Sequence, residues 1–197
     1  MPHGKQAKML TPKQETAVLT YLQTMRYPAR DRVMFLLSMK AGLRAKEIAS
    51  LTWAMVTDAE GQVAEVMSLE NKASKGQSGG RMIPLNALLR HALIELYQLR
   101  GGEVHPDRPV VYSERGGPLT ASSVTKWFFH LYRDLGMAGC SSHSGRRTFI
   151  TRAARKVSEV GGSVRDVQQL AGHASLQTTQ RYIDGDTEAK RKLVQLI

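Results

Sequence analysis

The segment Gly42-Leu43-Arg44-Ala45-Lys46-Glu47-Ile48-Ala49-Ser50-Leu51 joins two helical stretches of the chain. Gly42 follows a run of apolar residues, and a glycine at such a point ends a helix because it adopts the left-handed conformation without a steric penalty. The spacing predicts a short third helix over about 44–51, with Ile48 and Leu51 facing the core. The same short helix carries a cation and a carboxylate three residues apart, Arg44 and Glu47, a spacing that lets the two side chains pair.

Two helices are predicted before this turn. Thr11-Pro12-Lys13-Gln14 combines an N-cap, a proline at the first helical position and the glutamine of a capping box. A second helix should begin near Pro28 and end at Gly42, because Val33, Leu36 and Leu37 recur at helical spacing.

The hydrophobic period changes after the short helix. Residues 61–69 and 81–85 alternate as strands do, and a lysine- and glycine-rich stretch separates them. This pattern predicts an antiparallel hairpin with a basic, glycine-rich loop.

Helices return in the rest of the chain. We predict them over 86–100, from the N-cap Thr120 onward, over 143–156, and from the N-cap Ser163 to about residue 170. The cluster Trp127-Phe128-Phe129 is interpreted first as core, with a base-stacking platform as the alternative. Residues 156–162 are interpreted as a loop of ordinary length. The predicted fold class is therefore mainly α with one small antiparallel β-sheet.

The charge of the chain points to a polyanionic partner. Lys and Arg number 28 against 17 Asp and Glu, so the formal net charge is +11 and the sequence pI is about 10.0. The excess is spread along the chain, which favours a basic face on the fold over a basic tail. Nucleic acid is the leading partner class, and a soluble protein that is merely basic is the alternative.

Other classes of protein are excluded. The single cysteine, Cys140, cannot form an intramolecular disulfide or a cysteine-based structural zinc site. No apolar run approaches the ~20 residues that cross a bilayer, and the N-terminus lacks the apolar core of a signal peptide. We expect a soluble, cytoplasmic protein without a membrane partner.

Two further clusters carry residues suited to phosphate chemistry. One is His143-Ser144-Gly145-Arg146-Arg147, and the other runs from Gly172-His173 to Thr178-Thr179-Gln180-Arg181-Tyr182. Each cluster is common when taken alone. Arg147 is interpreted as a DNA-backbone contact or a surface charge rather than a catalyst.

Taken together and in this order, the clusters resemble the catalytic domain of the tyrosine recombinase (phage integrase) family over about residues 10–184. The interval from His173 to Tyr182 and a hairpin lysine before Arg81-Met82-Ile83-Pro84 both fit. The resemblance implies a DNA breaking-rejoining catalytic fold as one domain over 1–197, with a tail segment over 187–197. It also leads us to expect that the N-terminal DNA-clamping domain usual in the family is absent.

The resemblance implies a role for each site residue. Arg44 and Arg146 would clamp the phosphate, and Glu47 would brace a clamp arginine. Tyr182 would be the nucleophile, and His143 would help to move its proton. His173 would hydrogen-bond the scissile phosphate, and Lys75 would protonate the 5′ leaving oxygen. Lys72 is the alternative to Lys75. We prefer Lys75 because its distance to Pro84 along the sequence fits the family better. Gly145 stands where the family often has leucine, which we expect to loosen the start of its helix.

We expect neither a metal nor another cofactor. The sequence has no cluster of His, Cys, Asp or Glu at ligand spacing, so arginine forks would have to neutralise the phosphate oxygens.

The function that follows is site-specific DNA strand exchange through a 3′-phosphotyrosyl intermediate. The expected partners are double-stranded DNA in the nucleoid, three further copies of the chain in a tetramer on DNA, and a separate DNA-binding protein in place of the missing domain. Two alternatives remain open at this point: DNA relaxation of the type IB topoisomerase kind, and a non-catalytic DNA-binding regulator or accessory factor.

Overall fold

The computed structural model describes residues 6–70, 80–102, 104–182 and 194–195. The chain divides into two compact units, Met1–Phe149 and Ile150–Ile197. Lys72, Lys75 and most of the predicted tail segment lie outside the described residues.

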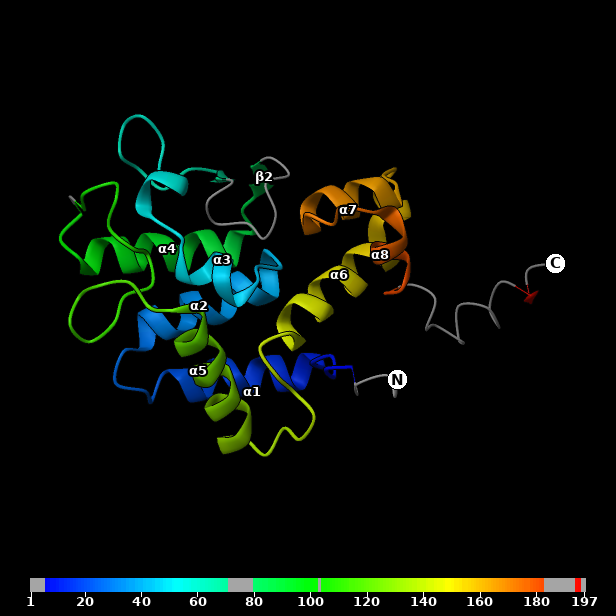
Figure 1. Cartoon of the computed structure of the whole chain (residues 1–197), viewed down its shortest axis with the longest axis horizontal. Helices are drawn as coiled ribbons and strands as arrows, with labels where there is room; N and C mark the ends of the chain where they lie inside the picture. The colour runs from blue at the N-terminus through cyan, green and yellow to red at the C-terminus, as the bar shows by residue number, and fades with distance from the viewer. Residues whose placement is uncertain (1–5, 71–79, 103, 183–193, 196–197) are drawn as a thin grey trace. The chain divides into compact units, whose positions relative to one another are not determined.

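The first unit contains most of the elements drawn in Figure 1. They are α1 (Pro12–Leu22), α2 (Pro28–Lys40), α3 (Ala45–Ala49), the 3-10 helix η1 (Trp53–Met55), β1 (Val66–Leu69), β2 (Arg81–Pro84), α4 (Ala87–Leu99), α5 (Ala121–Asp134) and the beginning of α6 (Ser144–Lys156). The second unit contains the rest of α6, η2 (Val157–Val160), α7 (Val164–Ala171) and α8 (Leu176–Gln180).

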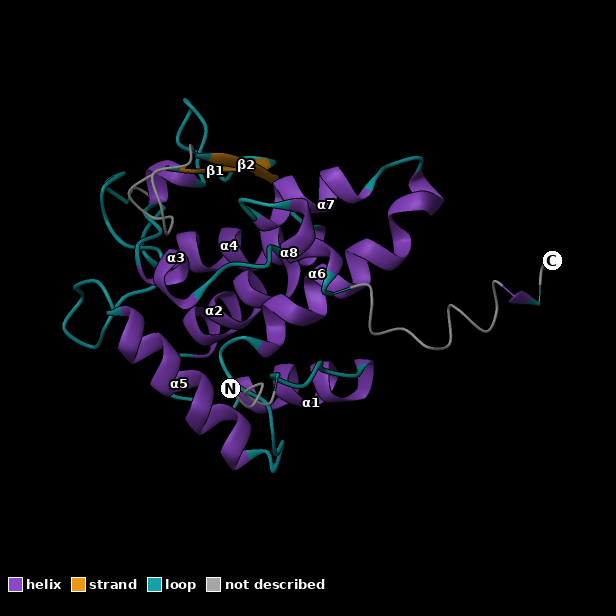
Figure 2. Ribbon diagram, turned by 45° about the vertical axis from the view of Figure 1, so that its right-hand side comes forward, coloured by secondary structure: helices purple, strands orange, loops and turns teal. Residues whose placement is uncertain are grey.

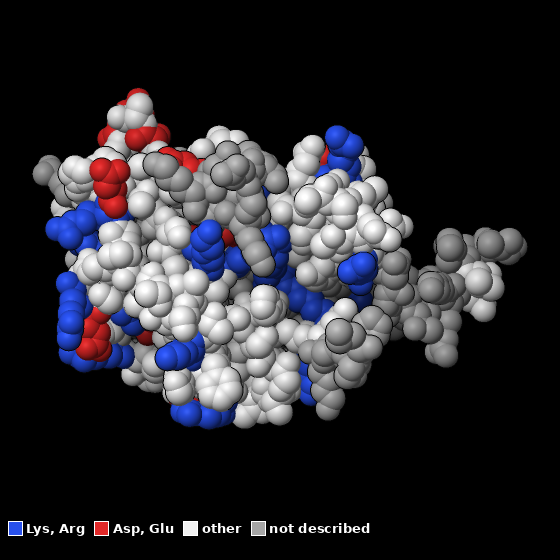
Figure 3. All heavy atoms as spheres, in the orientation of Figure 1, with Lys and Arg blue, Asp and Glu red and all other residues white. Residues whose placement is uncertain are grey.

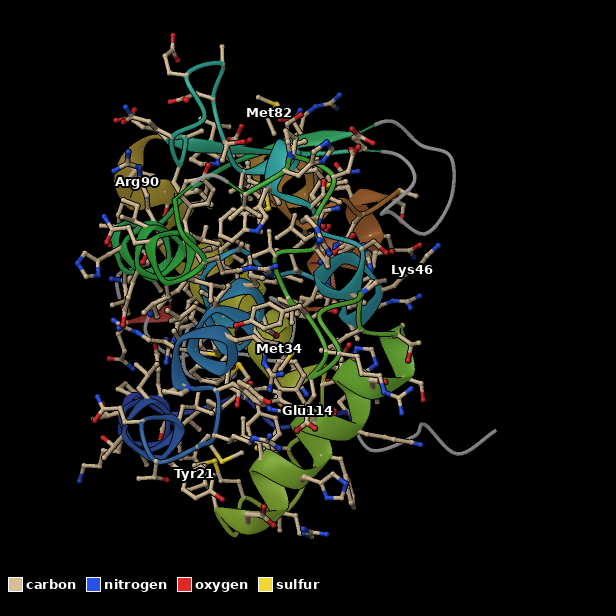
Figure 4. The ribbon with its side chains drawn as sticks, turned by 90° about the vertical axis from the view of Figure 1, so that its left-hand side faces the viewer. Tyr21, Met34, Lys46, Met82, Arg90 and Glu114 are labelled. Carbon is tan, nitrogen blue, oxygen red and sulfur yellow. The ribbon has the colours of Figure 1, made fainter. Side chains whose placement is uncertain are left out.

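Helix α2 is the centre of the first unit. The five consecutive residues Val33, Met34, Phe35, Leu36 and Leu37 are all buried. Such a run is apolar on every side of the helix, as is typical of a helix surrounded by protein. Helices α1, α3 and α4 pack against α2, and α5 packs against α3. Figure 4 shows the Met34 side chain among these helices, whereas Lys46 and Met82 lie at the surface.

The predicted helix ends are confirmed where the sequence carries capping signals. Thr11 and Gln14 form the capping box of α1, and Ser163 and Asp166 form that of α7. Gly42 has a φ of 65°, and the Leu43 amide donates back to the Leu37 carbonyl at 3.1 Å, so the chain reverses directly after α2.

The sheet is a two-stranded antiparallel hairpin, drawn in orange in Figure 2. Met67 pairs with Ile83, and both are buried, so one face of the hairpin belongs to the core. The strands are shorter than the sequence pattern predicts, since residues 61–65 lie outside β1. Arg81 is the first residue of β2 and pairs with Leu69 at the loop end.

Three local predictions are wrong or incomplete. Phe128 is buried, but Phe129 is 60% exposed, because consecutive helical positions point in different directions. Residues 157–160, within the predicted loop, form the 3-10 helix η2. Helix α8 was not predicted, because five residues are too few to show a hydrophobic period.

The N-terminal segment lies against the beginning of α6. The Lys8 amide donates to the Gly139 carbonyl at 3.0 Å, and the Leu10 amide donates to Thr148 Oγ1 at 2.9 Å. Arg147, expected at a DNA backbone or free at the surface, instead donates to the Ala7 carbonyl at 2.7 Å. This cation therefore has a structural role in the first unit. Among the described residues, no helix is long and apolar enough to span a membrane.

Gly145 does not loosen the beginning of α6, contrary to expectation. A Cβ atom at this position would lie 2.4 Å from Ser38 Oγ and 2.9 Å from Ser38 Cβ. The absence of a side chain therefore lets the first turn of α6 approach α2 closely, and the glycine serves packing.

We expect Gly145→Ala to lower the free energy of unfolding by about 1–2 kcal/mol, although alanine is the better helix former, because the added methyl group overpacks the contact with Ser38. Gly117→Ala is the control, since the nearest atom to a Cβ there is 4.0 Å away. Urea denaturation of both variants measures the effect. Equal midpoints for the two variants would contradict this account of the contact.

Candidate active site

The side chain of Glu47 is the centre of a charged cluster in the first unit. It is only 1% exposed, and both of its oxygens accept hydrogen bonds from two arginines. Oε1 accepts from Arg44 Nη1 at 3.0 Å and from Arg81 Nη1 at 2.8 Å. Oε2 accepts from the Arg44 backbone amide at 2.7 Å and from Arg81 Nη2 at 3.1 Å. One buried carboxylate thus joins α3 to the first residue of β2.

The electrostatics of this cluster keep Glu47 ionised. Burial by itself raises the pKa of the Glu47 carboxyl, but the hydrogen bonds and charges of Arg81 and Arg44 outweigh burial and hold the pKa below its ordinary value. The two guanidinium groups and the carboxylate together carry one net positive charge. A positive group fixed in this way is suited to an anionic substrate, since its orientation does not have to change when the substrate binds.

Arg146 is attached to the turn that leads into Arg44. Its side chain is buried, and Nη1 donates to the Gly42 carbonyl at 2.5 Å. Gly42 lies two residues before Arg44, so the arginine of α6 and the N-cap arginine of α3 share one anchoring segment. His143 lies just before α6 and is exposed, and its carbonyl accepts from the Arg147 amide at 2.9 Å. The three-residue spacing sets His143 one helical turn before Arg146.

The second unit brings His173 and Tyr182 together. The two rings stack with their centroids 5.6 Å apart and an angle of 20° between their planes. His173 Nδ1 lies 2.9 Å from Thr179 Oγ1, and the Tyr182 amide donates to the Thr179 carbonyl at 3.0 Å. Gln168 on α7 holds the His173 backbone on both sides, accepting from its amide at 3.1 Å and donating to its carbonyl at 3.0 Å.

The predicted site residues therefore fall into two sets. Arg44, Glu47, His143 and Arg146 belong to the first unit, and His173 and Tyr182 belong to the second. The hairpin lysines, Lys75 and Lys72, lie outside the described residues. Within the part of the chain that the structure covers, no group of three or more His, Cys, Asp or Glu side chains is placed to hold a metal ion.

Sequence reasoning missed two residues that contact members of these sets. Arg81 was noted only as the start of a strand, and its pairing with Glu47 spans 34 positions of sequence. Thr179 was noted only as part of a motif, and its contact with His173 depends on the unpredicted helix α8. The one available signal for Arg81 was its charge at the loop end of a predicted strand.

Basic side chains are spread over the face of the first unit drawn in Figure 3, while acidic ones gather towards one end. This distribution agrees with the net charge of +11.

The fold defines a class of protein. The architecture is that of tyrosine recombinase catalytic domains. A crystal structure of XerA recombinase matches with a TM-score of 0.74 and 22% identity, covering 100% of this chain and 66% of that one. A structure of a lambda integrase dimer bound to a core site matches with a TM-score of 0.66 and 19% identity, covering 91% of this chain and 49% of that one.

The chain belongs to the phage integrase family, whose sequence pattern matches residues 8–189. It is 30% identical over 161 residues to a tyrosine recombinase XerC of Brucella suis biovar 1, covering 81% of this chain and 48% of the relative. It is 33% identical over 155 residues to a tyrosine recombinase XerC of Chromohalobacter salexigens, covering 78% and 47%. The chain thus spans about half the length of these relatives.

We expect Glu47→Gln to lower the free energy of unfolding at neutral pH by about 2–4 kcal/mol, because an amide removes the negative charge that two arginines share. The difference from the wild type should shrink as the pH falls below 4.5, the ordinary pKa of the carboxyl. The folded pKa is lowered, so the stabilisation by the carboxylate is complete above the unfolded pKa and is lost as the pH falls through the folded pKa.

Chemical denaturation across this pH range measures the effect. Glu114→Gln is the control, since its ion pair with Arg26 is exposed and should contribute less than about 1 kcal/mol. A Glu47→Gln deficit that stays constant down to the acid limit would contradict the proposed charge sharing.

Proposed function

We propose that this chain catalyses site-specific DNA strand exchange through a 3′-phosphotyrosyl intermediate. The observation that carries the proposal is the stacked pair of His173 and Tyr182, which lie on either side of the short helix α8 in a phage integrase family chain. An imidazole beside a phenol is a reasonable arrangement for a tyrosine that must act on phosphate, since a phenol with an ordinary pKa near 10 needs local activation.

The proposed reaction is a pair of transesterifications. Tyr182 Oη attacks the scissile phosphorus, the bond from phosphorus to the 5′ oxygen breaks, and the protein becomes joined to the 3′ phosphate. The tyrosine proton leaves through His143, and Lys75 gives a proton to the 5′ oxygen, with Lys72 as the alternative donor. The 5′ hydroxyl of a second strand then attacks the phosphotyrosine and restores the phenol. Each step exchanges one phosphoester bond for another, so no external energy source is required.

The arginines stabilise the charge that develops on the phosphate. Arg44 and Arg146 would each direct a planar fork at the non-bridging oxygens, and His173 would add a hydrogen bond. The fixed geometry of Arg44, Glu47 and Arg81 supports this role, because a guanidinium oriented before the substrate arrives does not have to be reordered during the reaction. We propose that both residue sets act on the same phosphodiester and that the reaction requires no metal ion.

The relatives favour recombination over the two alternatives. The two XerC relatives and the XerA structure are named as recombinases, and the lambda structure is named as an integrase. These names indicate strand exchange rather than DNA relaxation or non-catalytic regulation. We propose double-stranded DNA as the partner, and the structure of a lambda integrase dimer bound to a core site supports this proposal. We also propose a tetramer on DNA in the cytoplasm.

The test uses a nicked suicide duplex, whose cleavage releases a short fragment and traps the covalent complex. We expect the wild-type chain to become attached to the 3′-phosphate end at equal rates in EDTA and in Mg²⁺. Tyr182→Phe removes one oxygen and keeps the ring, so it should bind DNA with near-native affinity and form no adduct. Denaturing gel electrophoresis measures the adduct, and a gel-shift titration measures the affinity.

Tyr112→Phe is the matched control, because it removes a phenolic oxygen from a residue that lies outside both sets. It should cleave as the wild type does. An adduct formed by Tyr182→Phe, or strict metal dependence of the wild type, would contradict the proposed mechanism.

A further inference from the structure

The two neighbouring threonines of α8 have different surroundings. Thr179 is fully buried, and its Oγ1 lies 2.9 Å from His173 Nδ1. Thr178 instead belongs to the beginning of the helix, where its Oγ1 lies 3.0 Å from Ser175 Oγ and its amide donates to the same Ser175 oxygen at 3.4 Å. Only Thr179 therefore places a hydroxyl against the imidazole.

Thr179 contacts both of the functional residues of the second unit. Its hydroxyl lies against the ring of His173, and its carbonyl accepts from the Tyr182 amide at 3.0 Å. The backbone of His173 is held separately by Gln168, and its ring plane is set by stacking on Tyr182. Rotating the ring by half a turn about its Cβ–Cγ bond would preserve the stacking but would replace Nδ1 by a carbon next to Thr179. The hydroxyl thus selects one of two ring orientations.

The contact also bears on where the ring proton lies. A neutral imidazole has one N–H donor and one acceptor nitrogen, and the partner of one nitrogen decides the state of the other. A buried hydroxyl requires a hydrogen-bond partner for its own proton. If Thr179 donates to Nδ1, the ring proton must be on Nε2.

We propose that Thr179 is a positioning residue that holds His173 as the Nε2–H tautomer, so that Nε2 is the donor directed at the scissile phosphate. The consequence for the reaction rests on the proposed function. The residue does not touch the substrate. It orients the imidazole by its side chain and the nucleophile's backbone by its carbonyl.

The direct test is the tautomer of His173 in the full chain labelled with ¹⁵N-histidine. Two-bond nitrogen–proton correlation spectra distinguish a protonated ring nitrogen from an unprotonated one, and the His173 signals are identified by their loss in His173→Gln. We expect a protonated Nε2 and an unprotonated Nδ1 in the wild type and in Thr179→Ser, which keeps the hydroxyl. Thr179→Val, which removes it at nearly constant volume, should give a mixture of tautomers.

The kinetic arm is single-turnover cleavage of the suicide duplex. We expect Thr179→Val to cleave about 10-fold or more slowly with unchanged DNA affinity, since a misplaced group loses rate rather than binding. Thr179→Ser should restore the rate to within about threefold, and the control Thr178→Val should match the wild type within the same margin.

A wild-type ring protonated on Nδ1, or on both nitrogens at neutral pH, would overturn the proposal, and this measurement needs no variant to fold. A wild-type tautomer retained in folded Thr179→Val would overturn it as well. Absence of any adduct with wild-type protein would refute the proposed function alone, because the NMR spectra report the role of Thr179 without reference to cleavage.

Discussion

The first unit's site depends on the ion pairs that the buried carboxylate of Glu47 makes with Arg44 and Arg81. A buried charge is costly unless partners surround it, so the fold must bring both arginines to this point. In doing so it fixes Arg44 to α3 and attaches the loop end of β2 to the same group. The strand that follows the hairpin lysines is thereby tied to an arginine of the proposed clamp.

The packing around this cluster depends on close approaches that only glycine permits. Gly42 reverses the chain after α2 and offers its carbonyl to Arg146, and a Cβ on it would lie 2.5 Å from a ring carbon of Phe149. Gly145 lets the first turn of α6 lie against Ser38. These contacts set where α6 begins, and hence where His143 and Arg146 project. In the second unit, hydrogen bonds with Gln168 and Thr179 position His173 instead.

Local signals in the sequence were sufficient for most of the helices, since caps such as Thr11 and turn residues such as Gly42 act on their immediate neighbours. They were insufficient for contacts between distant segments. Arg81 finds Glu47 across the fold, and no periodicity encodes that pairing. The interpretation of Gly145 failed because its neighbour, Ser38, is more than a hundred positions away. The motifs identified residue types suited to phosphate chemistry and the supporting carboxylate Glu47, whereas the contacts of Arg81 and Thr179 became visible only in three dimensions.

The central claim is that Tyr182 is the residue that becomes joined to DNA, and peptide mapping of the trapped complex tests it most directly. The adduct formed on a suicide duplex would be digested with a nuclease and trypsin, and the nucleotide-bearing peptide would be sequenced by mass spectrometry. The account predicts a nucleotide on the peptide that begins after Arg181, attached at Tyr182 through a bond stable to hydroxylamine. A nucleotide on any other residue would contradict it.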